Sequence, residues 1–149
     1  SNEDYARIMT GFIADVVAQG IRHMAFGDLF LEDVRAYREQ QLAGTGIEPL
    51  FPLWGSNTRE LAPQMVAAGL KARISALDPN KLDASLGGHD FDDVLLAALP
   101  EGVDPCGENG EFHTLAYDGP MFARPLGIRV GETVLRDGFI FTDLLPIED

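Results

Sequence analysis

The hydrophobic pattern at the start of the chain repeats with the period of a helix. Apolar side chains recur at helical spacing with polar residues between them, and the apolar set is Tyr5, Ile8, Met9, Phe12, Val16 and Val17. Such spacing predicts an amphipathic helix. Ser1 or Asn2 is a suitable N-terminal cap, and Gly20 is a suitable end.

Two short apolar runs flank the next helical pattern. Residues 23–28 and 48–53 are strand-like, and residues 31–42 between them again have apolar positions at helical spacing. Pro49 and Pro52 lack an amide hydrogen, which restricts the second strand to a sheet edge or an irregular pairing.

A third helix begins at the capping box Asn57-Thr-Arg-Glu60 and continues to about Ala68, just before Gly69. Residues 71–77 are strand-like, and residues 90–99 predict a fourth helix capped by Asp90. Because strands and helices alternate up to this point, their order predicts a mainly parallel sheet with right-handed crossovers.

The pattern changes after Pro100. Residues 102–110 have no apolar period and predict a loop, whereas 111–117, 128–135 and 139–144 are strand-like. Asp137-Gly138 is typical of a type I′ turn, so the last two strands should form an antiparallel hairpin. The chain therefore predicts an α/β fold in which a parallel sheet is followed by a smaller mixed α+β part.

Composition and charge narrow the classes of function. Of the 149 residues, 24 are Asp or Glu and 11 are Lys or Arg, which gives a net charge of −13. The electrostatic field of so negative a chain repels nucleic-acid backbones, so we expect no broad nucleic-acid binding. A few arginines and a divalent cation can still hold a small polyanion. Cys106 is the single cysteine, which excludes a disulfide framework, and no apolar run is long enough to span a membrane. We therefore expect a soluble cytoplasmic protein.

Gly27 and Asp28 stand at the carboxyl end of the first predicted strand, where α/β sheets bind ligands. Asp28 can bind a metal ion or a ribose hydroxyl there, and it can equally cap the following helix. On that helix Glu32, Arg35 and Arg38 fit a solvated face of ion pairs. The two arginines also lie beside an apolar stripe, which favours an anion clamp, and both interpretations stay open.

Residues 102–114, Gly-Val-Asp-Pro-Cys-Gly-Glu-Asn-Gly-Glu-Phe-His-Thr, carry the densest set of reactive side chains. If Glu111 begins a strand, Glu111 and His113 project from one face, where a carboxylate beside an imidazole can tune proton transfer. The competing interpretation is a plain hairpin turn at Asn109-Gly110. We favour a functional loop, because such a turn seldom needs a carboxylate on each side with His and Cys nearby.

Two other patterns are weaker. Cys106 and His113 could form a nucleophile and its base, but their spacing proves no contact. The sequence Ser85-Leu-Gly-Gly-His-Asp90 faintly resembles the Ser-Gly-Gly-x-Asp-Ser loop that wraps pyrophosphate in one class of ATP-cleaving enzymes. Leu86 interrupts that pattern and no Lys is present, so a loop leading to the helix cap at Asp90 is the better interpretation.

Three stretches together resemble the diphthine-ammonia ligase family, also called N-type ATP pyrophosphatase domain proteins. They are residues 25–38, 49–54 and 102–114, of which Gly-Glu-Asn-Gly-Glu-Phe-His-Thr is the most specific part. The resemblance runs in register over nearly the whole chain. It implies that residues 1–54 are the remnant of an ATP-binding, adenine-nucleotide alpha-hydrolase-like (PP-loop, Rossmann-like) parallel sheet, and that 55–149 form a C-terminal substrate-binding domain.

The resemblance also implies an ATP-dependent amide-forming ligase. ATP, with Mg²⁺, adenylates a carboxylate and releases pyrophosphate, and ammonia then displaces AMP. In the named members the carboxylate belongs to diphthine, a modified histidine of elongation factor two. On this basis Asp28, beside Gly27, would bind the nucleotide or its Mg²⁺, while Arg35 and Arg38, with Glu32, would meet phosphate or the substrate carboxylate.

The same reasoning assigns roles in the loop. Glu108 and Asn109, with Gly110, would position the acceptor. Glu111 and His113 would hold ammonium and take its proton, since an uncharged amine is needed for attack on the acyl-adenylate.

The chain departs from the family pattern in one large respect. The family's Ser-Gly-Gly-Lys-Asp-Ser phosphate loop, and the strands and helices near it, are absent from these residues. Because the backbone N–H groups of that loop bind pyrophosphate, we expect this chain alone to be inactive. We also expect a partner chain, a swapped copy of this chain or an N-terminal fragment to cover the open edges of the strands at 23–28 and 48–53. The rival functions are a non-catalytic interaction module that needs a separate nucleotide-binding chain, and a Cys106/His113 hydrolase.

Overall fold

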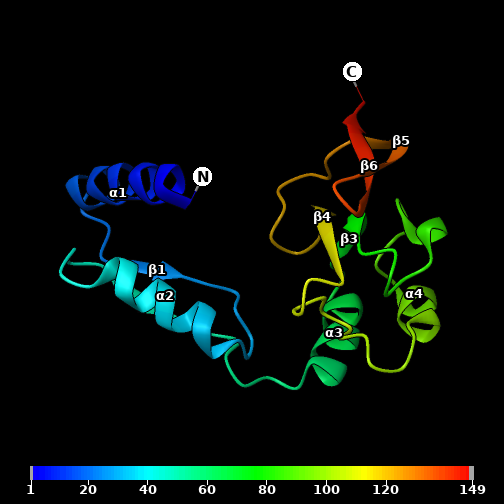
Figure 1. Cartoon of the computed structure of the whole chain (residues 1–149), viewed down its shortest axis with the longest axis horizontal. Coiled ribbons are helices and arrows are strands. Elements are labelled where there is room, and N and C mark those ends of the chain that lie inside the picture. Colours follow the sequence, from blue (N-terminus) through cyan, green and yellow to red (C-terminus); the bar gives the residue numbers. More distant parts are fainter. Residues whose placement is uncertain (1, 148–149) are drawn as a thin grey trace. The chain divides into compact units, whose positions relative to one another are not determined.

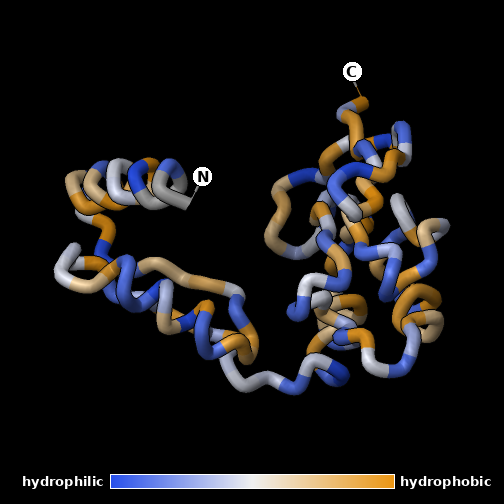
Figure 2. Tube along the Cα trace, viewed as in Figure 1, coloured by the Kyte–Doolittle hydropathy of each residue, from blue (hydrophilic) through white to orange (hydrophobic). Residues whose placement is uncertain are grey.

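The computed structural model describes residues 2–147 and divides the chain into two compact units, Ser1–Ser56 and Asn57–Asp149 (Figure 1). Each unit has its own cluster of buried apolar residues. Hydrophobic and hydrophilic residues are interleaved along the helices of both units (Figure 2), as expected for elements that bury one side.

Two short parallel strands and two helices form the first unit. In chain order they are α1 (Asn2–Ala18), β1 (His23–Ala25), α2 (Glu32–Leu42) and β2 (Glu48–Leu50). β1 and β2 pair in parallel, so the predicted pairing is confirmed here, although both strands are shorter than expected. Pro49 has no amide hydrogen, but the residues next to it make the hydrogen bonds that join the two strands. Glu48 N–H donates to Arg22 O (2.8 Å), and Phe26 N–H donates to Leu50 O (2.9 Å).

The core of this unit lies where α1 meets the end of α2. Ile13 and Val16 of α1 pack with Leu42 and Ile47, and all four side chains are buried. The chain leaves α1 through Gly20 at φ +85°, a left-handed conformation that favours glycine. Of the two predicted N-terminal caps, Ser1 lies outside the described residues, and Asn2 is the first residue of the helix.

The second unit is a four-stranded antiparallel sheet with two short helices. α3 (Thr58–Ala67) precedes β3 (Lys71–Leu77), and the 3-10 turn η1 (Ala84–Leu86) precedes α4 (Asp93–Ala98). The remaining strands are β4 (Phe112–Asp118), β5 (Ile128–Arg136) and β6 (Phe139–Pro146), and the spatial order is β4-β3-β6-β5.

The expected parallel arrangement of the strand at 71–77 is wrong. β3 pairs antiparallel with both β4 and β6. A parallel connection needs a crossover element that carries the chain back along the sheet. α4 has only 6 residues and packs beside α3 instead, so the chain returns next to β3 in the opposite direction.

The helix predicted for 90–99 begins later than expected. Asp92, rather than Asp90, caps α4 by accepting a hydrogen bond from Leu95 N–H (2.9 Å). Asp90 instead accepts from Arg73 Nε–H of β3 (2.7 Å) and from the Tyr117 hydroxyl of β4 (3.0 Å). These hydrogen bonds therefore attach the loop that contains Asp90 to the sheet.

Two local signals are confirmed. The side chain of Asn57 caps α3, because its oxygen accepts from Arg59 N–H (3.0 Å) and its amide donates to Glu60 (3.3 Å). Asp137 and Gly138 have φ values of +52° and +85°, as a type I′ turn requires, and they join β5 to β6.

α3 and α4 cover one face of the antiparallel sheet. The buried cluster that they share with the strands is Ala62, Ala72, Ile74, Leu77, Leu82, Phe91, Leu95, Val103 and Phe112. Leu77 is paired in register with Phe112 and with Ile140, and directly opposite residues share a face of a sheet. The side chains of the next residue along each strand therefore face the uncovered side.

Candidate functional site

The loop between α4 and β4 is folded around the carboxylate of Glu111, which is 2% exposed. Its Oε1 accepts hydrogen bonds from Asp104 N–H (3.1 Å) and from the Asn109 side-chain amide (3.2 Å). Its Oε2 accepts one from Asn109 N–H (2.9 Å). Three donors of the loop converge on one buried charge, and this arrangement fixes residues 104–111 as a compact structure, named here the carboxylate loop.

Asp104 and Gly107 complete the carboxylate loop. Asp104 is also buried, and its Oδ2 accepts from Glu108 N–H (2.9 Å). Gly107 has a φ of +69°, and a Cβ there would lie 2.7 Å from Phe112 O, so only glycine fits. Because the loop joins α4 to β4 rather than two strands, the interpretation as a plain hairpin turn is wrong.

Lys81 and Asp78, which the sequence did not single out, support the carboxylate loop from the segment after β3. Lys81 Nζ donates to Asn109 O (3.0 Å), and Asp78 N–H donates to Glu111 O (2.9 Å). Lys81 is separated from Asn109 by 28 positions in sequence, so no local spacing could have identified it.

The surroundings of Glu111 keep its carboxylate charged. Burial by itself raises the pKa of Glu111, but hydrogen bonds from loop N–H groups and from the Asn109 amide, together with the charge of Lys81, outweigh it. The pKa of Glu111 is therefore below its ordinary value of 4.5. A carboxylate engaged in this way holds the loop together.

The other predicted residues of this region lie nearer the surface. Glu108 and Gly110 are partly exposed, whereas Asn109 and His113 are exposed, His113 on β4. Across residues 2–147, no hydrogen bond or ion pair joins the imidazole of His113 to Glu111, and Glu111 precedes β4. We expected the Glu111 carboxylate and the His113 imidazole to lie side by side, and the structure does not bring them together.

Cys106 lies in the carboxylate loop with its thiol 3.8 Å from Thr58 O. Burial, and then the carboxylates of Asp104 and Glu108, raise the pKa of this thiol to about 11. The thiol therefore stays protonated at neutral pH, which makes it a poor nucleophile. This environment disfavours the Cys106/His113 hydrolase.

The residues predicted to bind nucleotide lie in the first unit. Asp28 Oδ2 is 3.6 Å from Arg38 Nε, and the Arg38 guanidinium lies 5.1 Å from the centroid of the Phe26 ring. Asp28 does not cap α2, since the N-cap position is Leu31 and has no side-chain cap bond. The capping alternative for Asp28 is therefore wrong.

Arg35 lies against two aromatic rings. Its guanidinium carbon is 4.7 Å from the Phe51 centroid and 4.8 Å from the Trp54 centroid, while its Nε–H donates to Glu39 (2.9 Å). The side chain is still 37% exposed, so part of the guanidinium can meet an anion. Gly27 and Glu32 are exposed.

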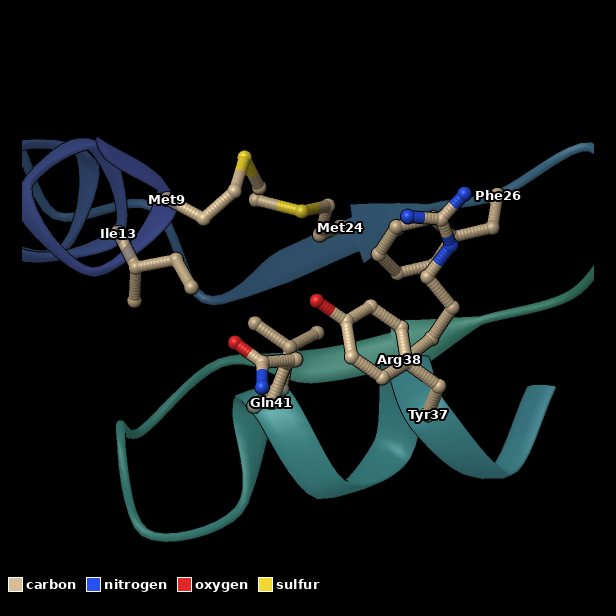
Figure 3. Close-up of a pocket in the computed structure, with 8 residues that line it drawn as sticks. Met9, Ile13, Met24, Phe26, Tyr37, Arg38 and Gln41 are labelled. Carbon is tan, nitrogen blue, oxygen red and sulfur yellow. The ribbon is translucent and has the colours of Figure 1, made fainter. Parts of the chain in front are cut away.

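An apolar pocket adjoins Arg38 in the same unit (Figure 3). Its lining comes from α1, β1, α2 and the residues next to them, and comprises Met9, Ile13, Met24, Phe26, Tyr37, Arg38, Gln41 and Leu42. Such a lining suits an apolar group rather than a phosphate.

The described side chains do not by themselves fit Mg²⁺. Within residues 2–147, no group of three or more His, Cys, Asp or Glu side chains is placed to hold a metal ion. Protein sites for Mg²⁺ use octahedral oxygen ligands, commonly one or two carboxylates completed by phosphate and water. Asp28, the predicted ligand, is paired with Arg38.

The glycines at 87 and 88 have a packing role. Asp83 caps η1 by accepting from Ser85 N–H (2.8 Å), and a Cβ at Gly87 would collide with Thr142 Oγ1 of β6. This segment is therefore a packed turn against the sheet, and it does not lead to a cap at Asp90.

These features define a two-unit α/β protein whose second unit carries a loop closed on a buried carboxylate. Residues 57–143 match the family model described as diphthamide synthase C-terminal domain. The chain therefore belongs to the diphthamide synthase C-terminal domain family, in agreement with the resemblance seen in the sequence.

Curated relatives carry the name diphthine–ammonia ligase. The rat protein is 29% identical over 128 residues, which are 81% of this chain and 47% of the rat protein. The zebrafish protein is 31% identical over 126 residues, which are 79% of this chain and 48% of the zebrafish protein. The human protein is 31% identical over 103 residues, which are 64% of this chain and 38% of the human protein. The chain thus spans about half the length of these relatives, or less. No helix in the described part of the chain is long and apolar enough to cross a membrane.

Proposed function

We propose that this chain is part of an ATP-dependent amide-forming ligase of the diphthine–ammonia type. The observation that carries the proposal is the carboxylate loop, which lies inside the region that matches the family. A carboxylate attacks ATP to give an acyl-adenylate and pyrophosphate. Ammonium first gives a proton to a base, the resulting ammonia attacks the acyl carbon, and AMP leaves as the new amide nitrogen loses a second proton to solvent.

Within the loop, Glu111 is a positioning residue, because its buried carboxylate is engaged by three donors of the loop itself. Glu108, Asn109 and Gly110 then present the outer surface of the loop to the acceptor. His113, which is exposed two positions beyond Glu111, takes the proton of ammonium.

The first unit supplies positive groups for the nucleotide or the carboxylate. The guanidinium groups of Arg35 and Arg38 are held by aromatic rings and still have exposed area. Gly27, Asp28 and Glu32 border them. ATP and Mg²⁺ also require a phosphate-binding part that these 149 residues do not contain, so this chain alone turns over no ATP.

The test combines the chain with ATP, Mg²⁺, ammonium and elongation factor two that carries diphthine, with and without the remaining part of the rat relative. The expected result is AMP release that requires ammonium, the diphthine protein and both parts. AMP release by the chain alone would contradict the predicted dependence on a second part. No AMP release with both parts present would favour the non-catalytic interaction module.

A further inference from the structure

The turn that follows β3 is fixed at both ends. Leu82 is 3% exposed and belongs to the buried cluster of the second unit, while Asp78 N–H donates to Glu111 O (2.9 Å). Asp78 also closes the turn, because its backbone oxygen accepts from the N–H groups of Lys81 and Leu82 (3.0 Å each). The backbone of Lys81 is therefore held between the core and the carboxylate loop.

From this fixed backbone the side chain of Lys81 reaches the outer part of the carboxylate loop. Its Nζ donates to Asn109 O (3.0 Å), although the side chain lies at the surface of a chain in which 24 of 149 residues are Asp or Glu. Among the described residues Lys81 makes no ion pair, so its hydrogen bond goes to a neutral carbonyl of the loop instead. Lys81 thus attaches the turn to the loop at Asn109.

Asn109 is held at every polar group except its side-chain oxygen. Its N–H donates to Glu111 Oε2 (2.9 Å), and its side-chain NH₂ donates to Glu111 Oε1 (3.2 Å). Its backbone oxygen accepts from Lys81, and the N–H of Gly110 donates to Gly107 O (3.0 Å). In the described part of the chain no donor reaches Asn109 Oδ1, and Asn109 is exposed. This oxygen is therefore the acceptor that the loop leaves available at its surface.

An amide oxygen with a fixed orientation suits ammonia. Ammonia donates through its N–H groups and attacks through its lone pair, so an acceptor that binds an N–H can direct the lone pair toward the acyl carbon. Glu111 cannot take this role, because hydrogen bonds from its own loop already occupy both of its oxygens. The value of the oxygen of Asn109 depends on how firmly the residue is held, and Lys81 supplies the contact on its backbone.

We propose that Lys81 is a positioning residue for the amide-forming step: together with Glu111 it fixes Asn109, whose side-chain oxygen accepts an N–H of ammonia. This inference rests on the proposed function, in which the outer surface of the carboxylate loop faces the acceptor. It adds the atom that binds the nucleophile and the residue that keeps this atom in place.

The test uses the two-part system with ATP, Mg²⁺, labelled ammonium and diphthine-bearing elongation factor two. Lys81→Met should lower kcat/KM for ammonium about fivefold, since a hydrogen bond of ordinary strength is lost, while ATP–pyrophosphate exchange continues at the wild-type rate. Lys81→Arg keeps a long side chain with N–H donors and should restore most of the loss. Lys71→Met is the matched control, because Lys71 is an exposed lysine at the other end of β3 whose Nζ donates to Asp118 (2.9 Å).

The chain alone gives a second readout. NMR order parameters of the backbone amides of residues 108–110 should fall in Lys81→Met and keep their wild-type values in Lys71→Met. Circular dichroism checks that each variant is folded. Three results would overturn the inference: a wild-type kcat/KM for ammonium in Lys81→Met, equal losses of exchange and incorporation, or unchanged order at 108–110.

Failure of the proposed function has a different signature. If the wild-type chain incorporates no label with both parts present, the proposed function is refuted, and with it the binding of ammonia at Asn109. The order parameters then decide alone whether Lys81 fixes Asn109. An active wild type with an unaffected Lys81→Met variant would instead refute the role of Lys81 and leave the proposed function standing.

Discussion

Replacing Glu111 by Gln tests whether the carboxylate loop is held by a buried charge. The wild-type carboxylate only accepts, and it receives hydrogen bonds from Asp104 N–H and from both the backbone and the side chain of Asn109. A glutamine has the same shape but brings an NH₂ group in place of one oxygen. One N–H donor of the loop would then face the NH₂ donor of the glutamine inside a buried site.

The expected loss in the free energy of unfolding follows from these three hydrogen bonds. Hydrogen bonds to charged groups contribute about 1.5–3 kcal/mol each, and leaving a buried donor unsatisfied costs about 1–3 kcal/mol. Glu111→Gln loses one of three bonds and weakens the other two, so we expect a loss of about 2–4 kcal/mol in the free energy of unfolding. Urea denaturation followed by circular dichroism measures this as a lower midpoint with an unchanged slope.

Glu101→Gln is the matched control, because Glu101 is exposed in the same segment. The pH dependence gives a second check. Because the pKa of Glu111 in the folded chain is below 4.5, its stabilisation is complete at neutral pH and is lost as the pH falls below about 4.5. The gap between wild type and Glu111→Gln should therefore close in acid. A variant as stable as Glu101→Gln, or a gap that widens in acid, would refute the reasoning.

Three further predictions concern the same loop. Gly107→Ala should destabilise the chain by about 1–3 kcal/mol more than Gly110→Ala, since both sites have positive φ but only Gly107 approaches Phe112 O; equal urea midpoints would contradict this. Cys106 should react slowly with iodoacetamide at neutral pH, because the pKa of its thiol is about 11, and mass spectrometry showing rapid labelling would reopen the hydrolase alternative. Lys81→Met should speed amide hydrogen exchange at Asn109 a few-fold by removing the contact with the Asn109 carbonyl, and exchange as slow as in wild type would exclude that support.

Local signals in the sequence were sufficient for most elements of the fold. Periodicity located the helices and strands, the capping box at Asn57 placed the start of α3, and Asp137-Gly138 predicted the hairpin of β5 and β6. These features depend on residues that are close together along the chain. The direction of β3 depends on which distant strands pair with it, and alternation of elements predicted the wrong partners.

The sequence singled out residues 102–114, but it did not predict how their side chains are arranged. The density of Glu, Asn, His and Cys marked residues 102–114, yet the alternation rule for strands placed Glu111 beside His113. The rule fails because Glu111 precedes β4 and turns toward the N–H groups of its own loop. The support from Lys81 and the stacking of Arg35 on Phe51 and Trp54 depend on the tertiary fold, which spacing alone does not encode.

The most direct test of the central claim follows isotopically labelled ammonium into the diphthine protein in the two-part system. Glu108→Gln changes the outer surface of the carboxylate loop, whereas Glu101→Gln serves as the control outside it. If the loop serves the amide-forming step, Glu108→Gln should lower label incorporation at least tenfold while ATP–pyrophosphate exchange continues, and Glu101→Gln should match wild type. Equal incorporation by wild type and both variants would contradict the claim.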